Sequence, residues 1–82
     1  MCRFFGIIIA MFYKDHDPPH FHAIYGDQMG LIEITSRKIE INLSSRTQKI
    51  VLEWLDINEK DILENWELAK QKKPLIKIKP LD

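Results

Sequence analysis

Three histidines within a short segment are the residues of this sequence best suited to chemistry. They lie in Asp15-His16-Asp17-Pro18-Pro19-His20-Phe21-His22. Imidazole titrates near neutral pH, so it can serve as a general acid, a general base or a metal ligand. If a strand begins at His20, then His20 and His22 project from the same face of it, about 7 Å apart. We therefore place any chemistry of the chain at this pair.

Metal binding is the first chemistry open to the pair. Zinc sites combine histidines with a third protein ligand, and catalytic ones keep an open position. His16 is the nearest third candidate, but the two prolines favour an extended path of about 3.1 Å per residue, which puts His16 roughly 12 Å from His20. Asp15 and Asp17 share this difficulty. The sequence thus requires no cofactor, and His20 with His22 are the candidate ligands if zinc or another divalent metal binds.

Acid–base catalysis is the second chemistry. One histidine acting as base and another as acid could cleave RNA at its own 2′-hydroxyl, which would make the chain an RNA-cleaving hydrolase. Such a site also needs a cation for the phosphate, and the candidates are Arg3, Lys14, Arg37 and Arg46. A third interpretation has no chemistry: His16 caps a loop, and His20 and His22 bond to neighbouring carboxylates or backbone.

Composition limits the class of protein. Twelve basic and twelve acidic residues cancel, which argues against a protein that grips nucleic acid through a broad positive face. Cys2 is the only cysteine, so a disulfide-held secreted design is excluded and the reducing cytoplasm is expected. The longest apolar run, residues 4–13, is about half the length of a membrane helix. We expect neither a membrane span nor a signal peptide.

The elements that must position the histidines form one domain over residues 1–82. Residues 4–13 are almost continuously apolar, as in a central strand covered on both faces. Strands are also expected at 20–25, 30–35 and 38–43, where apolar and polar residues tend to alternate.

Helical periodicity follows the strands. Ser45 and Gln48 have the spacing of a capping box, and Asn58 is suited to cap a second helix. The apolar stripes of these helices assign Trp54 and Trp66 to the core. The prediction is an α+β fold: a small antiparallel or mixed sheet of about four strands packed by two consecutive C-terminal α-helices.

The C-terminal residues 75–79 alternate apolar residues with lysine, which is typical of an exposed edge strand. They are the candidate for a fifth strand at the sheet edge. An open edge could accept a strand from a partner chain. The sequence therefore also predicts a non-catalytic protein–protein interaction module as an alternative, and it leaves homo-oligomers open.

Several segments together resemble a known bacterial family. They are Arg3-Phe4-Phe5-Gly6-Ile7, Met11-Phe12-Tyr13, residues 15–23, Val51-Leu52-Glu53-Trp54, Asn65-Trp66-Glu67-Leu68-Ala69 and Pro74-Leu75. The chain is similar through them to the family named domain of unknown function 4160. It departs from the family at Leu43-Ser44-Ser45-Arg46, where many members have prolines after the leucine.

The resemblance implies a genetic context. Members of the family are typically encoded beside a small protein of domain-of-unknown-function family 2442, in pairs that look like toxin–antitoxin modules. This chain would be the toxin-like member, and the antitoxin-like protein from the neighbouring gene would be its partner. His16, His20 and His22 match the family motif and become the first site residues, with Arg3, Tyr13, Asp15 and Asp17 behind them.

Overall fold

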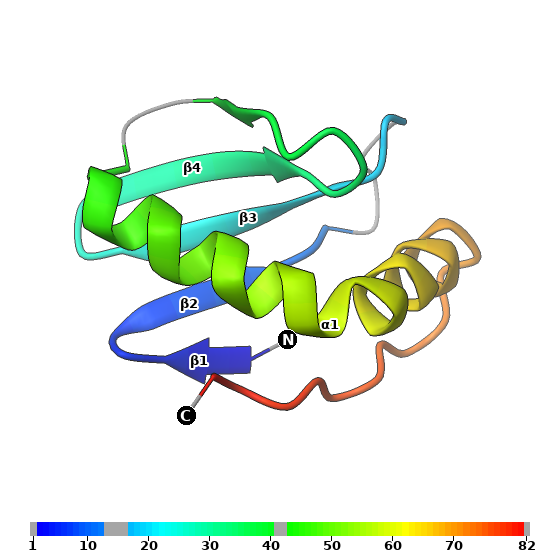
Figure 1. The fold of residues 1–82 in the computed structure, drawn as a ribbon. Helices are drawn as coiled ribbons and strands as arrows, with labels where there is room; N and C mark the ends of the chain where they lie inside the picture. Colours follow the sequence, from blue (N-terminus) through cyan, green and yellow to red (C-terminus); the bar gives the residue numbers. More distant parts are fainter. Residues whose placement is uncertain (1, 13–16, 41–42, 82) are drawn as a thin grey trace.

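The chain folds into an antiparallel sheet covered on one face by a long helix (Figure 1). The computed structural model describes residues 2–12, 17–40 and 43–81. Its strands run in the order of the chain: β1 (Cys2–Phe4), β2 (Ile7–Ala10), β3 (His20–Tyr25), β4 (Gln28–Glu33) and β5 (Ile39–Glu40), followed by helix α1 (Ser45–Lys70). Every strand pair in these ranges is antiparallel. The predicted α+β class is therefore confirmed, with five strands.

The strand predicted over residues 4–13 is wrong in its extent: Phe4 ends β1, and the shorter strand β2 follows, inside the sheet as predicted. β1 turns into β2 through Phe5 and Gly6, both with positive φ angles, of 50° and 78°. Glycine adopts this left-handed conformation without steric cost. Gly6 also lies close to Tyr25, since a Cβ atom there would be 3.1 Å from Cε1 of the tyrosine ring. β1 is thus an edge strand, and β2 lies between β1 and β3.

Helix α1 replaces the two predicted helices. It runs for 26 residues, and only Asn58 departs from helical geometry, with φ −115° and ψ 17°. The Asn58 side-chain amide donates to the carbonyl oxygen of Trp54 at 3.0 Å, so the residue expected to cap a second helix marks a kink. The N-cap is Ser44 rather than Ser45, and its hydroxyl accepts from the Thr47 amide at 3.2 Å. No helix in the described ranges is both long and apolar enough to cross a membrane.

Residues 73–81, called the terminal strap here, run back along the helix toward β1 without forming the predicted edge strand (Figure 1). Helix side chains bond to the strap backbone instead. Asn65 accepts from the Ile76 amide at 2.7 Å and donates to the Ile76 carbonyl at 2.9 Å. The Trp54 indole donates to the Lys79 carbonyl at 2.9 Å. Because its backbone bonds to side chains of α1, the strap does not join the sheet. The fifth strand is instead the N-terminal β1.

The core lies between the sheet and α1. Trp54 and Trp66 are 0% and 2% exposed, which confirms their predicted place in it. The ring of Trp54 packs against Phe4 and Phe21, with centroids 5.4 and 5.7 Å away. Burial of one such aromatic side chain contributes about 1.5 to 3 kcal/mol. These contacts fix the helix over β1, β2 and β3, and thereby place its C-terminal half near the start of β3.

A candidate site at the start of β3

The two histidines of β3 lie together at the beginning of the strand. Their ring centroids are 5.6 Å apart in a T-shaped arrangement. His20 pairs with Glu33 of β4, and His22 lies between Ala10 of β2 and Leu31 of β4. The alternate residues of the strand, Phe21 and Ala23, are fully buried beneath the helix. The strand thus brings together the two imidazoles that the sequence singled out.

His20 is held on two sides. Its Nδ1 atom lies 2.8 Å from the carbonyl oxygen of Pro18. Since a carbonyl oxygen only accepts, Nδ1 must carry a proton, and the lone pair of a neutral ring is then on Nε2. The ring also packs on Trp66 at 5.0 Å between centroids, and the residue is only 9% exposed. His20 is therefore oriented by its surroundings.

His22 has a different environment. It is half-buried, and its ring lies 4.6 Å from that of Phe12, a residue that is 48% exposed. The Nε2 atom of His22 is itself buried. As a whole residue His22 is nevertheless more exposed than His20, and the exposed Phe12 lies beside its ring.

The last turns of α1 complete this end of the molecule. The Trp66 indole donates to Asp17 Oδ1 at 3.1 Å, and Lys70 Nζ lies 3.8 Å from Asp17 Oδ2. Before β3, the Pro19 carbonyl accepts from the Ile34 amide at 2.9 Å, which holds the segment against β4. We call this region the histidine end; its residues are Phe12, Asp17, His20, His22, Trp66 and Lys70.

Sequence reasoning did not identify Lys70 and Trp66 as part of the site. Their spacing of four residues places them on one face of a helix, and that signal was available. Only the fold decides which loop that helix face meets. Lys70, with a side chain 44% exposed, is the cation that the structure puts beside the histidine segment.

The other predicted site residues lie elsewhere or outside the described residues. Arg3 is on β1, paired with Ile8, and β2 separates it from the histidines. Arg37 binds Glu59 and Asp56 at 2.8 and 3.0 Å; the hydrogen bond to Glu59, more than that to Asp56, raises the pKa of Arg37. Arg46, the last of the predicted phosphate-binding candidates within the described residues, is exposed in the first turn of α1. Three predicted site residues, Tyr13, Asp15 and His16, fall outside the described residues, as does Lys14.

The described ranges give little support to a metal site or to a reactive thiol. They contain no group of three His, Cys, Asp or Glu residues that could hold an ion. His20 and His22 alone would supply two ligands. Burial raises the pKa of the Cys2 thiol, which opposes a nucleophilic role for it at neutral pH.

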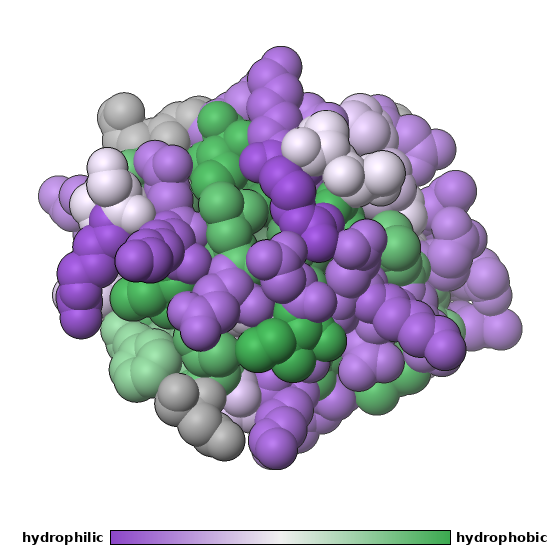
Figure 2. Space-filling model, viewed as in Figure 1, coloured by the Kyte–Doolittle hydropathy of each residue, from purple (hydrophilic) through white to green (hydrophobic). Residues whose placement is uncertain are grey.

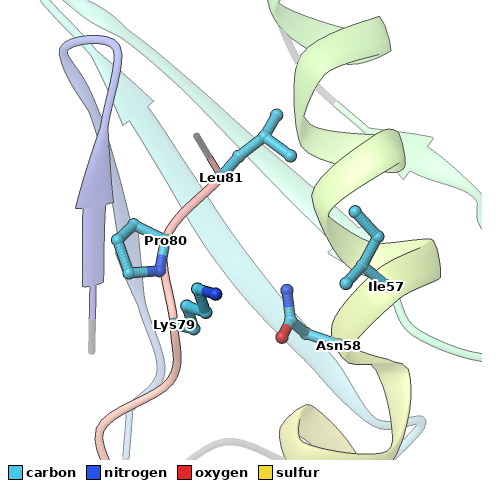
Figure 3. A pocket seen from close by; sticks show the side chains of 5 residues that line it. All are labelled: Ile57, Asn58, Lys79, Pro80 and Leu81. Carbon is cyan, nitrogen blue, oxygen red and sulfur yellow. The ribbon is translucent and has the colours of Figure 1, made fainter.

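A separate pocket of about 220 Å³ lies between the kink of α1 and the terminal strap (Figure 3). Its lining residues are Ile57, Asn58, Lys79, Pro80 and Leu81. None of them belongs to the histidine end. Lys79 is the one titratable residue among the described residues that line the pocket, so the candidate chemistry remains at β3.

Fold and site define a small α+β domain in which a helix covers one sheet face and a histidine pair opens the third strand. The profile of the family described as domain of unknown function (DUF4160) matches residues 6–67, and the chain belongs to this family. The match includes the whole histidine segment. Neither the curated proteins nor the solved structures contain a significant match.

Proposed function

We propose that the chain is the toxin-like component of a bacterial toxin–antitoxin pair and that its histidine end acts on the cellular target. The observation that carries the proposal is the pair of imidazoles 5.6 Å apart in a segment that the family match covers. The genetic context implied by the family resemblance supplies the partner, an antitoxin-like protein from the neighbouring gene. We infer that this partner covers the histidine end.

RNA is the target class that the residues of this end favour. One histidine would remove the proton of a 2′-hydroxyl as its oxygen attacks the adjacent phosphorus. The other would donate a proton to the 5′-oxygen as the P–O bond breaks, so the products are a cyclic phosphate and a free hydroxyl. Lys70 supports this chemistry, because its partly exposed ammonium group lies beside Asp17 of the histidine segment, and by Glu67, and can bind a phosphate oxygen.

Growth of a bacterial host tests the proposal. Induction of the wild-type chain alone should arrest growth, and co-expression of the neighbouring gene should restore it. His22→Ala should abolish the arrest because it removes one proton-transfer group. Lys60→Ala, an exposed substitution away from the histidine end, should leave it intact. Normal growth of cells that contain soluble, folded wild-type protein would contradict the toxin role.

An assay with purified protein tests the target class separately. Wild-type protein should cleave single-stranded RNA in the presence of a metal chelator, and Lys70→Ala should slow the cleavage by about tenfold if it loses one phosphate contact worth about 1.4 kcal/mol. Cleavage that stops with the chelator and returns with zinc would favour a metal-dependent site. Growth arrest without any RNA cleavage would retain the toxin role and reject RNA as the target.

The second candidate is a non-catalytic interaction module. Within the described ranges the two edge strands are short, with three residues in β1 and two in β5. The sheet face turned away from α1 carries the half-buried Ile8, Ile24 and Leu31, which favours contact through the face. A stable complex with the neighbouring gene's protein that is indifferent to His20→Ala and His22→Ala would support this candidate over histidine chemistry.

A further inference from the structure

Charge is segregated along the face formed by α1 and the terminal strap, which is mainly hydrophilic (Figure 2). Residues 53–67 of α1 contain six acidic residues and one lysine, whereas residues 68–81 contain five lysines and no acidic residue. All five are exposed; they are Lys70, Lys72, Lys73, Lys77 and Lys79. The zero net charge therefore conceals a narrow basic region, called the lysine strip here, that runs from the end of α1 along the strap.

The end of α1 accounts for three of these lysines. The Lys72 amide donates to the Ala69 carbonyl at 3.0 Å, in a turn that reverses the chain. The Lys73 amide donates to the Leu68 carbonyl at 2.9 Å in the same turn. Cations are favourable in the last turn of a helix and just after it, because the terminal carbonyl groups carry partial negative charge. Lys70, Lys72 and Lys73 thus have a structural reason for their charge.

Lys77 and Lys79 are too far along the strap for this explanation. The strap bonds to Asn65 through Ile76 and to Trp54 through Lys79. Both helix residues lie more than one turn before the end of α1, where the effect of the helix dipole has fallen off. Within the described ranges, neither of the two lysines forms an ion pair. Their charges are therefore available to a ligand.

The spacing of these two lysines suits a linear polyanion. Ile78 between them is 2% exposed, whereas Lys77 and Lys79 are both exposed, as in an extended segment whose side chains alternate. Such a segment places the two lysines about 6 to 7 Å apart on the same side. Neighbouring phosphates of an extended single strand of nucleic acid have a similar spacing, and lysines that neutralise phosphates dominate affinity for such a strand.

The pocket beside Lys79 adds an apolar contact to this charge. It measures about 220 Å³, and its apolar lining comes from Ile57, Pro80 and Leu81. The side chains of Asn58 and Lys79 point toward each other across it (Figure 3). Pockets for drug-sized ligands are about 300 Å³ or larger, so this one suits a single small ring. A nucleobase in the pocket would lie beside a cation for its phosphate.

We propose that the lysine strip and this pocket bind single-stranded RNA, with Lys77 and Lys79 on neighbouring phosphates and a base in the pocket. Lys70, at the other end of the strip, lies 3.8 Å from Asp17 of the histidine end. RNA on the strap would therefore extend toward the histidine pair. The choice of RNA rests on the proposed function, although binding itself requires no cleavage. An acidic protein segment or an anionic membrane matches the charges but does not place a ring beside each of them.

Fluorescence anisotropy of the full chain tests binding to a labelled 2′-O-methyl oligouridine, which cannot be cleaved because it has no free 2′-hydroxyl. Lys77→Gln with Lys79→Gln should weaken binding about tenfold. It should also reduce the slope of log affinity against log salt concentration by about 1.4, since each phosphate contact to a single strand contributes about 0.7. The reduced slope is a readout that a merely structural role of the lysines would not change.

Lys49→Gln with Lys60→Gln is the matched control. Both lysines are exposed on α1, so the net charge changes equally away from the strap. The affinity for the oligouridine should stay within about twofold of the wild-type value. Circular dichroism should show that both double variants are folded.

Two further ligands test the identity of the partner. An abasic oligomer of the same length carries the same phosphates without bases, so it should bind more weakly than the oligouridine. Equal affinity for the two oligomers would overturn the role of the pocket. Tighter binding of polyglutamate of equal charge, or of anionic phospholipid vesicles, would assign the strip to an acidic protein or a membrane and overturn the proposal.

This proposal and the proposed function can fail separately. A chain that cleaves RNA but binds the oligouridine equally well without Lys77 and Lys79 would overturn the strap site and leave the proposed chemistry intact. A chain that binds through these lysines but cleaves no RNA would retain the strap site and reject that chemistry. A wild-type chain that does not bind the oligouridine at low salt would overturn the strap site.

Discussion

At the scale of single residues, the two histidines of β3 are not equivalent. The Pro18 carbonyl and the Trp66 ring orient His20, which fixes the proton on its Nδ1 atom. His22 is more accessible and lies beside the exposed Phe12. The same strand therefore gives two identical side chains different surroundings.

A residue-scale prediction concerns Gly30 of β4. The Leu43 side chain occupies the position that a Cβ atom would take at this glycine. Gly30→Ala should therefore lower the free energy of unfolding by about 1 to 3 kcal/mol, the usual cost of overpacking. Denaturant unfolding measures the change.

A double-substitution cycle provides the control. Leu43→Ala removes the obstructing side chain, so the cost of Gly30→Ala should nearly disappear in that background. If the costs of the two substitutions simply add, close packing of Leu43 on Gly30 is not the cause of the destabilisation by Gly30→Ala. The sequence contains both residues but does not indicate this contact, because 13 positions separate them and only the turn into α1 brings them together.

At the scale of elements, local sequence patterns predicted whether a segment is a strand or a helix better than they predicted which segment it packs against. The alternation at β3 and the helical period around Trp54 and Trp66 each reflect burial on one side, and the structure agrees with them. Isoleucine–lysine alternation at 75–79 suggested a strand, but the strap bonds to helix side chains. No local pattern distinguishes a segment that pairs with a neighbouring strand from one that bonds to helix side chains. Asn65 illustrates this, since it is a fully buried polar residue inside an apolar stripe.

The prediction at this scale is that Asn65 fastens the strap to α1. Asn65→Leu keeps a side chain of similar size but leaves the Ile76 amide and carbonyl without their present partner. Each buried unpaired group costs about 1 to 3 kcal/mol, so the loss of both bonds should lower the free energy of unfolding by about 2 to 6 kcal/mol. Hydrogen exchange at the Ile76 amide should also accelerate.

Asn58→Ala is the control on the same helix. Its side chain makes a single bond to the Trp54 carbonyl and is only partly buried, so the cost should stay near 1 kcal/mol. Equal losses for the two variants, or unchanged exchange at Ile76, would show that Asn65 does not hold the strap.

At the scale of the whole molecule, the helix, the sheet and the strap share one core. Ile78 of the strap is 2% exposed and belongs to the same hydrophobic cluster as Trp54, Trp66 and the sheet residues. The family match ends at residue 67, before the strap begins. Sequence patterns therefore identify the sheet and the helix, the two main layers. The contribution of the strap to the core depends on long-range packing that these patterns do not show.

Two isoleucines of the strap test its contribution to the whole fold. Ile78→Ala should reduce the free energy of unfolding by about 2 to 5 kcal/mol, as expected for truncation of a buried side chain. Ile76→Ala is a matched control, because Ile76 is 45% exposed and its bonds to Asn65 use only backbone atoms. Its cost should be below about 1 kcal/mol. Thermal unfolding measures both, and for a domain of this size each kcal/mol corresponds to roughly 4 to 8 °C. If the Ile78→Ala and Ile76→Ala variants have the same melting temperature, the strap is peripheral to the fold. If Ile78→Ala has a lower melting temperature but still unfolds in a single transition, the strap unfolds together with the sheet and the helix.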